Sequence, residues 1–342
     1  MKLLEQLQAA FQLKVEIIIS MKNKLIEASK QPVLTMLFIL LAISITFSFL
    51  APSSFATTTN LTGLLSDVAI LLTISAGATY VIILAGIDLS VGSVLVFSGV
   101  MGGKMMERIG IENNFGIAIG FFVCLLSGLA WGLINGLIVA LAKVPPFVVT
   151  LGTLGAAYGL ALVICNGIDV RAIPADLVDF GNGRYFGIPL IAITALIVLT
   201  ICGVALKSSV YGQHSYAIGS NPESARRAGI NVDRHVITVY SVAGLLSGFA
   251  SFLSLARYGT TTIAGNQTLN LQVITAVVIG GTSLFGGTGW MLGTLIGVFI
   301  PVVLANGFII LGISPYWQYV AVGMVLIIAV TIDQRRRLRQ TT

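Results

Sequence analysis

The sequence predicts an all-α protein that crosses a membrane many times. Of its 342 residues, 56% are hydrophobic and only 9% are charged, and the mean hydropathy is +0.98. A soluble domain carries about 25% charged residues, so water is the wrong solvent for most of this surface. A helix needs about 20 mostly apolar residues to span a bilayer, and such stretches recur along the chain between short polar breaks.

We expect about ten transmembrane helices inside one membrane domain, residues 33–333. Residues 1–32 are interpreted as a cytoplasmic N-terminal lead, and 334–342 as a basic cytoplasmic tail. The first apolar stretch follows about thirty residues of lead and is longer than the apolar core of a signal peptide, so it is interpreted as a retained helix. The expected spans are 33–50, 64–85, 89–106, 115–142, 147–165, 187–206, 235–256, 271–285, 290–311 and 316–332.

Two runs of glycine predict close contacts between helices. Helices in lipid associate through small residues that let their backbones approach, and a spacing of four places such residues on one face. The runs are Gly128, Gly132 and Gly136, and Gly289, Gly293 and Gly297.

The distribution of charge predicts the orientation. With the N-terminus inside, the cytoplasmic loops collect basic residues, whereas the outer loop 166–186 holds three aspartates against two arginines, as the positive-inside rule requires. The net charge of +6 therefore reflects topology rather than nucleic-acid binding. The cytoplasmic basic residues are Lys143, Lys207, Arg226, Arg227, Arg234, Arg335, Arg336, Arg337 and Arg339.

Several functional classes lack their motifs. A P-loop needs a glycine-rich turn followed by Lys and Ser or Thr, and the nearest stretch, 102–105, lacks both the spacing and the hydroxyl. No metal-binding pair of histidines and no Gly-x-Ser-x-Gly sequence is present, so we expect neither an enzyme nor a metal site. The three cysteines lack metal-ligand spacing.

The longest cytoplasmic loop, 207–234, predicts a short surface helix. Asn221 can cap the free amides, Pro222 suits the first turn, and Glu223 complements the positive end of the helix dipole. Gly229 can adopt the left-handed conformation that ends a helix. A capped helix between two spans is a suitable shape for binding a soluble partner. Arg226 and Arg227 are interpreted either as contacts to acids on that partner or as ordinary positive-inside residues.

These features resemble those of a known family. Glu223, Ala225 and Gly229 have the spacing of the loop that permeases of ATP-binding-cassette importers insert into their ATPase. Four further segments, which lie in the family's order, resemble signatures of the ribose-type sugar permeases in the branched-chain amino acid/ribose permease superfamily. They are 86–92 (GIDLSVG), 135–136 (NG), 146–153 (PFVVTLGT) and 280–287 (GGTSLFGG).

The resemblance covers about residues 55–333 and implies a type II importer-like fold with a homodimeric permease in the bacterial inner membrane. It also implies a periplasmic sugar-binding protein and a separate cytoplasmic ATPase that holds ATP and Mg²⁺, so that this chain binds no cofactor. The expected activity is translocation of a monosaccharide, a pentose or a hexose. The lead of residues 1–31 is longer than the family predicts.

Asp88 admits two interpretations. An acid in an apolar region costs about 2.5–3.5 kcal/mol on insertion scales, so it normally has a role. We favour an N-terminal cap for the third span, with the carboxylate accepting from the amides of Ser90 and Val91. The alternative is a substrate or proton group beside the pathway.

The segment 280–287 is interpreted as a tight turn between two short spans, in which Gly280, Gly281, Gly286 and Gly287 are structural. Thr282 and Ser283 are expected to satisfy freed backbone groups there. A phosphate loop is less favoured because no charged partner accompanies it.

A neutral sugar calls for a pathway of amide and hydroxyl groups with little charge. Each candidate could instead bond a neighbouring helix. The candidates are Asp88, Ser90, Asn135, Thr153, Tyr158, Gln272, Thr275 and Asn306.

The main alternative is an ion-coupled secondary transporter of a small polar solute. Such proteins keep acids or histidines at membrane depth to carry the ion. Here only Asp88, and less plausibly Asp67, fits that role, because both histidines fall in or beside the basic cytoplasmic loop.

Overall fold

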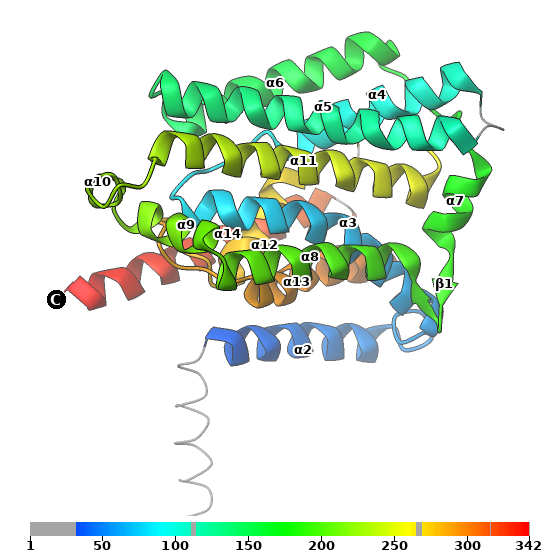
Figure 1. Ribbon diagram of the computed structural model, residues 1–342. Helices are drawn as coiled ribbons and strands as arrows, with labels where there is room; N and C mark the ends of the chain where they lie inside the picture. Colours follow the sequence, from blue (N-terminus) through cyan, green and yellow to red (C-terminus); the bar gives the residue numbers. More distant parts are fainter. Residues whose placement is uncertain (1–31, 111–113, 265–268, 315, 342) are drawn as a thin grey trace, which may run out of the picture.

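A computed structural model describes residues 32–110, 114–264, 269–314 and 316–341. Apart from one short hairpin, its regular structure is helical, so the predicted all-α architecture is confirmed (Figure 1). The expected N-terminal lead lies outside the described residues. In chain order the elements are α2 (Pro32–Leu50), α3 (Thr58–Ile83), α4 (Val91–Ile109), α5 (Asn114–Leu141), α6 (Pro146–Cys165), α7 (Ala175–Asn182), β1 (Arg184–Tyr185), β2 (Ile188–Pro189), α8 (Leu190–Ser208), α9 (Val210–Ser220), α10 (Pro222–Arg227), α11 (Val232–Tyr258), α12 (Leu269–Ile279), α13 (Met291–Ile310) and α14 (Tyr316–Thr341).

Each of the ten predicted spans contains a helix, but the helices are unequal. Within the described chain, six are long and apolar enough to cross a membrane, namely α3, α5, α6, α8, α11 and α13. By contrast α12 has 11 residues, which is about 17 Å and shorter than the ~30 Å core of a bilayer. The expected span 271–285 is therefore wrong at its end, because the helix stops at Ile279 before two glycines.

The predicted start of the second span is also wrong. The helix α3 begins at Thr58, six residues before the expected Leu64, because the side chain of Thr57 accepts from the amide of Asn60 at 3.2 Å and caps the helix. Average hydropathy does not detect this polar first turn, whereas the Thr57 cap determines where the helix begins.

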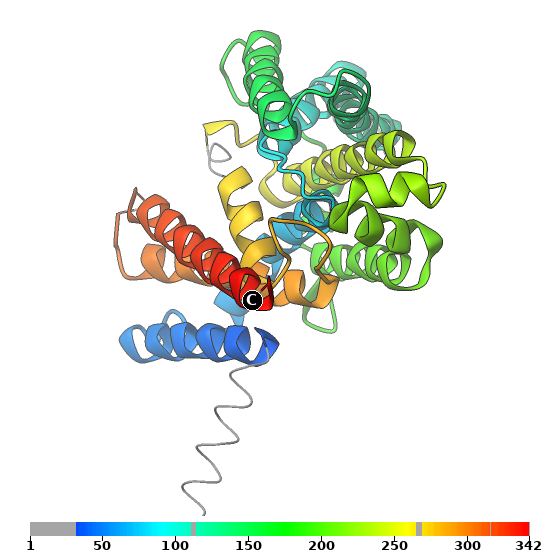
Figure 2. The same ribbon diagram turned by 90° about the vertical axis from the view of Figure 1, so that its left-hand side faces the viewer.

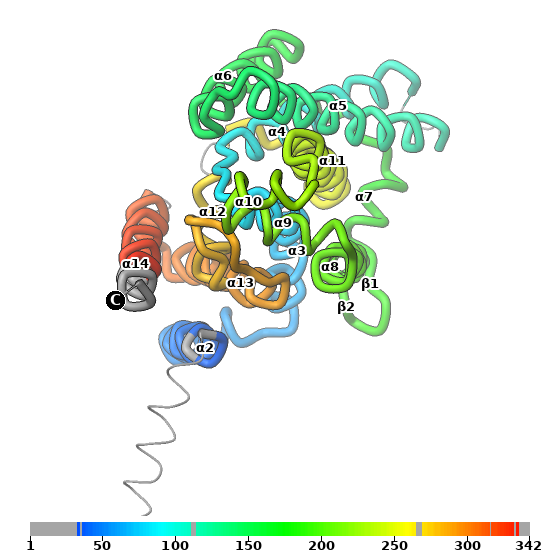
Figure 3. The backbone as a smooth tube through the Cα atoms, turned by 60° about the vertical axis from the view of Figure 1, so that its left-hand side comes forward, coloured from blue at the N-terminus to red at the C-terminus, as the bar shows by residue number. Residues whose placement is uncertain are grey.

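The helix α3 lies at the centre of the bundle. Nearly every residue from Leu64 to Ile83 is buried, and Figures 2 and 3 show α3 between α5 and α6 at one edge and α2 at the other. The outer helix α5 instead buries one stripe, with a spacing near four, that includes Gly116, Gly120, Cys124 and Gly128. Its exposed face carries Phe122 and Leu126, each 60% exposed, as expected of a helix against lipid.

The first predicted glycine seam is confirmed, and the second is confirmed in part, because Gly289 precedes α13 and packs against Thr282 and Ile83 instead of lying on the helix face. The stripe Gly128–Gly132–Gly136 packs on the backbone of α11, and a Cβ at Gly128 would clash with Gly244 and Gly248. In the second seam Gly293 and Gly297 lie against α12, close to Gly280 and Ala276. The absence of side chains at these positions therefore decides how closely the helices approach.

The polar connections gather at two opposite ends of the bundle. We call the end that carries α9, α10 and the loop with Lys143 the basic end, and the end that carries α7 and the β1–β2 hairpin the far end (Figure 1). The segregation of charge predicted for alternate loops is thus present: Lys143, Lys207 and Arg226 lie at the basic end, and Asp176 and Asp179 lie on α7.

Candidate functional site

The predicted surface helix is α10, at the basic end. The Oδ1 atom of Asn221 accepts from the amide of Ser224 at 3.0 Å, Pro222 is the first helical residue, and Glu223 lies in the first turn. Each role expected at the start of this helix is confirmed.

The other end of α10 confirms the role of Gly229. Its φ is +86°, and its amide bonds the carbonyl of Arg226 at 3.0 Å, while the amide of Ile230 bonds that of Ala225 at 3.1 Å. No atom lies within 4 Å of a Cβ built on Gly229, so glycine is needed for its conformation rather than for space.

The helix α10 is attached to the bundle by a small apolar cluster. Ala225 is 4% exposed and packs with Ile218 of α9 and Val232 of α11. Leu84, directly after α3, packs against the same cluster. We call α9, α10 and this cluster the coupling surface.

The coupling surface contacts the end of α3 and the non-helical segment before α13. The amide of Gly287 donates to the carbonyl of Ile83 at 2.9 Å, and a Cβ on Gly219 of α9 would clash with the same carbonyl. The Tyr216 hydroxyl of α9 donates to the carbonyl of Gly289 at 2.7 Å. The end of α3, the helix α9 and the turn 280–287 therefore meet at one place, which we call the α3 junction.

The two arginines of α10 differ in their ion-pair partners and in their exposure. Asp233 accepts both from Arg226 at 2.8 Å and from Lys143 at 2.7 Å, so Arg226 is held within the chain. Arg227 approaches Glu223 at 3.5 Å, but both side chains are about 80% exposed. Such a pair contributes little to stability, which leaves Arg227 accessible to a partner.

The segment 280–287 is a turn, as predicted, but only α12 of the two helices that it joins is short, because α13 has 20 residues. Gly281, Gly286 and Gly287 have positive φ, and the indole of Trp290 donates to the carbonyl of Gly280 at 2.9 Å. Of the two hydroxyl residues expected to satisfy backbone groups there, Ser283 does so and Thr282 does not.

Ser283 accepts from the amide of Phe285 at 3.3 Å and donates to Asp333 at 2.9 Å, so it does satisfy a backbone group. Thr282 does not: its buried hydroxyl has no hydrogen-bond partner within the described chain. The expectation for Thr282 was wrong because its side chain faces Gly289 rather than the open backbone of the turn.

Four predicted pathway residues form one buried chain of hydrogen bonds. Asp88 Oδ1 accepts from the amide of Ser90 at 2.8 Å and from its hydroxyl at 2.6 Å. The amide of Asn135 donates to the Ser90 hydroxyl at 2.9 Å, and Thr153 donates to Asn135 Oδ1 at 2.8 Å. This chain links the start of α4 to α5 and α6.

The capping role expected of Asp88 is found only in part. Its carboxylate accepts from Ser90, but the expected bond from the amide of Val91 is not formed, and the cap position itself is Ser90. The carboxylate fixes the turn before α4 instead. Asn270 of α12 donates to the carbonyl of Leu89 at 3.2 Å, so the first turn of α12 lies beside the segment that precedes α4.

The remaining pathway candidates lie apart from this chain. Gln272 and Asn306 line a cavity in the far half of the bundle. Thr275 is 1% exposed, and its hydroxyl has no partner among the described residues. Tyr158 is half-buried on α6 and packs against the main core.

The far cavity, as we call it, has a volume of about 200 Å³ and lies between α3, α11, α12 and α13. Its walls combine polar and apolar side chains. The polar lining residues are Asp67, Ser254, Tyr258, Gln272 and Asn306.

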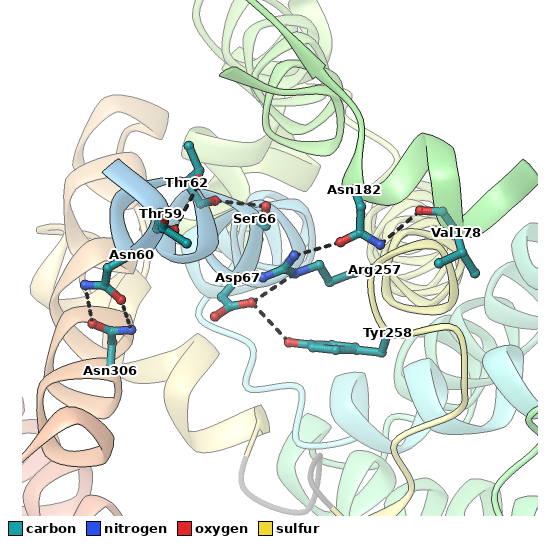
Figure 4. Close-up of polar contacts among 10 residues, drawn as sticks. All are labelled: Thr59, Asn60, Thr62, Ser66, Asp67, Val178, Asn182, Arg257, Tyr258 and Asn306. Atoms are coloured by element: carbon teal, nitrogen blue, oxygen red, sulfur yellow. Dashed lines mark hydrogen bonds and ion pairs between the residues drawn. The ribbon is translucent and has the colours of Figure 1, made fainter. Parts of the chain in front are cut away.

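An ion pair lies at the edge of the far cavity (Figure 4). The Nε atom of Arg257 is 3.6 Å from Asp67 Oδ1, and the Tyr258 hydroxyl donates to the same oxygen at 3.2 Å. Asn182 of α7 accepts from Arg257 at 3.0 Å. On the other side, Asn306 and Asn60 exchange two amide hydrogen bonds at 2.9 and 3.0 Å.

Arg257 and Tyr258 were not predicted as site residues from the sequence, and Asp67 was predicted only as a weak candidate for an ion-coupling acid. A signal was present, since Asp67 lies near the start of one predicted span and Arg257 directly follows another. Charges at membrane depth usually pair with one another, so the two could have been matched.

Comparisons with known proteins agree with these features. Residues 60–330 match the family described as branched-chain amino acid transport system/permease component. The chain is 39% identical over 302 residues to the ribose import permease protein RbsC of Bacillus subtilis (strain 168), covering 88% of this chain and 91% of that protein.

Two further relatives have similar coverage. The fructose import permease protein FrcC of Rhizobium meliloti is 36% identical, over 89% of this chain and 85% of its own length. The D-allose transport system permease protein AlsC of Escherichia coli (strain K12) is 35% identical, over 87% and 90%. No solved structure matches the chain. The resemblance to ribose-type permeases is confirmed, and the chain belongs to the permease-component family of branched-chain amino acid transport systems.

Proposed function

We propose that this chain is the membrane-spanning permease subunit of an ATP-binding-cassette importer that moves a monosaccharide. The coupling surface carries the proposal, because α10 is capped at both ends, exposed outside, and packed through Ala225 onto the end of α3. The names of the relatives, which are import permeases for ribose, fructose and allose, support the substrate class.

The proposal includes the finer arrangement expected from the sequence. The permease is a homodimer in the bacterial inner membrane, with about ten spans per subunit, a type II importer-like fold and both termini in the cytoplasm. The basic end then faces the cytoplasm, which agrees with the positions of Lys143, Lys207 and Arg226. The proposed domain limits are 33–333 for the membrane domain and 207–234 for the coupling loop within it.

Energy comes from a separate subunit in this proposal. A cytoplasmic ATPase binds ATP and Mg²⁺, and its closure pushes on α10. The push reaches Leu84 through Ala225, and the α3 junction through Gly219. From there it can shift the non-helical segments 84–90 and 280–287, which precede α4 and α13. Non-helical backbone absorbs such movement more readily than a hydrogen-bonded helix does.

The sugar arrives from a periplasmic binding protein and passes between the helices. Asp88, Ser90, Asn135 and Thr153 order the start of α4 beside the pathway, while Gln272 and Asn306 belong to the far half. An ion-coupled transporter is the alternative. It is disfavoured because Asp67 already has Arg257 as a partner and Asp88 is held by Ser90.

The first test is a mild-detergent pull-down of the tagged chain from its host, followed by reconstitution into proteoliposomes. We expect a near-stoichiometric polypeptide with a P-loop, lost when Glu223 and Gly229 are replaced, and sugar uptake that requires ATP. If the chain is recovered alone and moves solute under an ion gradient, the proposal is wrong, and Asp88 becomes the coupling candidate.

A further inference from the structure

The far cavity contains polar groups whose hydrogen-bonding capacity is unused. Within the described chain, the amide of Gln272 and the hydroxyl of Ser254 have no hydrogen-bond partner, although both residues line the cavity. Asp67 uses one carboxylate oxygen for both Tyr258 and Arg257, and its second oxygen has no partner among the described residues. None of these groups is sealed from solvent in the described chain, so each can bond a solute or water that enters the cavity.

The charge of the far cavity is balanced. Arg257 lies 3.6 Å from Asp67 and is itself held by Asn182. The carboxylate therefore has its counter-ion in the folded chain. A site for Na⁺ or a proton would keep an unpaired acid, and a site for an anion would keep an unpaired base. The balance favours a neutral solute.

The size and walls of the cavity limit that solute further. Its volume of about 200 Å³ is below the ~300–1,000 Å³ typical of sites for drug-sized ligands. Ile70, Leu71 and Val302 are among the apolar residues that line it. A monosaccharide has this character, since hydroxyl groups ring its edge and C–H groups cover its faces.

The place of the cavity in the fold also suits a translocation site. It lies between α3, α11, α12 and α13, near the start of α3, whereas the coupling surface packs at the end of that helix. The short helix α12 begins beside it at Leu269, and broken spans commonly border the binding sites of transporters.

We propose that the far cavity is a monosaccharide-binding site of the permease itself. Gln272 and Ser254 bond the sugar hydroxyls, and the neutral Asp67–Arg257 pair supplies a further acceptor while keeping ions out. The inference rests on the proposed function and names the site where the delivered sugar first enters the chain. Low affinity suffices there, because the binding protein concentrates the sugar.

The test uses the full chain reconstituted with its ATPase and binding protein in proteoliposomes. The probes are radiolabelled D-ribose, D-fructose and D-allose, and both uptake and ATP hydrolysed per sugar are measured. Gln272→Leu keeps the size of the side chain and removes its hydrogen bonds. We expect uptake to fall about three- to tenfold, as for the loss of one or two hydrogen bonds, while the ATP used per sugar rises.

Two further variants make the result interpretable. Leu271→Ala lies on the same helix outside the cavity and should retain wild-type uptake. Ser254→Ala removes one oxygen and tests the site again if Gln272→Leu does not fold; its expected loss is about threefold.

The failures of the two proposals are distinguishable. If the wild-type complex moves none of the three sugars with ATP, the proposed function fails. If the wild type transports a sugar but Gln272→Leu and Ser254→Ala do so equally well, with unchanged ATP use, the far cavity does not bind sugar and the proposed function stands.

Discussion

The two ends of the bundle differ in whether their polar groups have partners within the chain. At the basic end one oxygen of Asp233 accepts from both Lys143 and Arg226, and both ends of α10 are capped. At the far end Gln272 and Ser254 line a cavity without a partner in the described chain. An exposed helix whose ends are capped suits a protein partner, which supplies its own complementary face. A hollow with unused hydrogen-bonding groups suits a small solute.

The largest effect is expected from a substitution that detaches α10 at the basic end. Ala225→Asp places a charge in the apolar cluster beneath α10, where the residue is 4% exposed. Burying an unpaired charge costs several kcal/mol, so α10 should detach, with a loss of ATPase binding and of uptake of about 100-fold or more. Pull-down and uptake are the measurements.

The control for this variant is Ser224→Asp, which adds the same charge to the same helix at an exposed position. It should retain most of the ATPase binding, because the new carboxylate stays in water. Equal losses in both variants would show that charge, rather than attachment of α10, causes the defect.

A smaller effect is expected at the N-cap of α10. Asn221→Ala removes the acceptor for the amide of Ser224, which costs about 1 kcal/mol, or about fivefold in the equilibrium constant between the ordered and the frayed helix. ATP-driven uptake should fall by a similar factor. Asn221→Asp keeps the cap and should behave as the wild type; if it is as impaired as Asn221→Ala, the side chain acts through a contact other than capping.

Charge reversal at the two arginines of α10 should weaken ATPase binding with different salt dependences. Arg227→Glu should weaken ATPase binding about threefold at low salt, and the difference should shrink at 0.5 M salt, where exposed charges are screened. Surface plasmon resonance at two salt concentrations measures this. Arg226→Glu breaks the contact with Asp233 as well, so its defect should persist at high salt. Indistinguishable salt profiles would contradict the distinction.

The smallest effect is expected from a double variant that removes both charges of the Asp67–Arg257 pair and so leaves the far cavity neutral. The double variant Asp67→Asn with Arg257→Gln removes both charges and retains amide groups, so uptake should stay within about threefold of the wild type. Each single variant leaves one charge without its partner and should be worse than the double. If the double variant is the worst of the three, the pair acts through its charges rather than through their balance.

Much of the fold could be predicted because its signals are local. Ten apolar stretches predict helices where helices occur, and the residues around α10 carry their own start and stop signals in Asn221, Pro222 and Gly229. The short length of α12 was missed, because hydropathy continues through the glycine turn after the hydrogen bonds have stopped.

The candidate sites could be predicted less completely because their contacts join distant segments. Asn135 and Thr153 were named as separate candidates, yet they form one chain with Ser90 and Asp88. The partners Asp67 and Arg257 are 190 positions apart and stood at the margins of two predicted spans. Pairing of this kind depends on which helices become neighbours, and hydropathy does not encode that.

The sequence by itself determined that the protein lies in a membrane, where most of its helices are, that α10 is capped, and which family the protein belongs to. Those properties follow from composition and from residues close together in the chain, where apolar length and capping groups act directly. Only the tertiary structure decided that α10 rests on the end of α3, that Asp88 belongs to a buried chain, and that a neutral cavity lies at the far end. Packing decides such features, because the glycine seams bring α5 onto α11 and α12 onto α13 and so set which polar side chains meet.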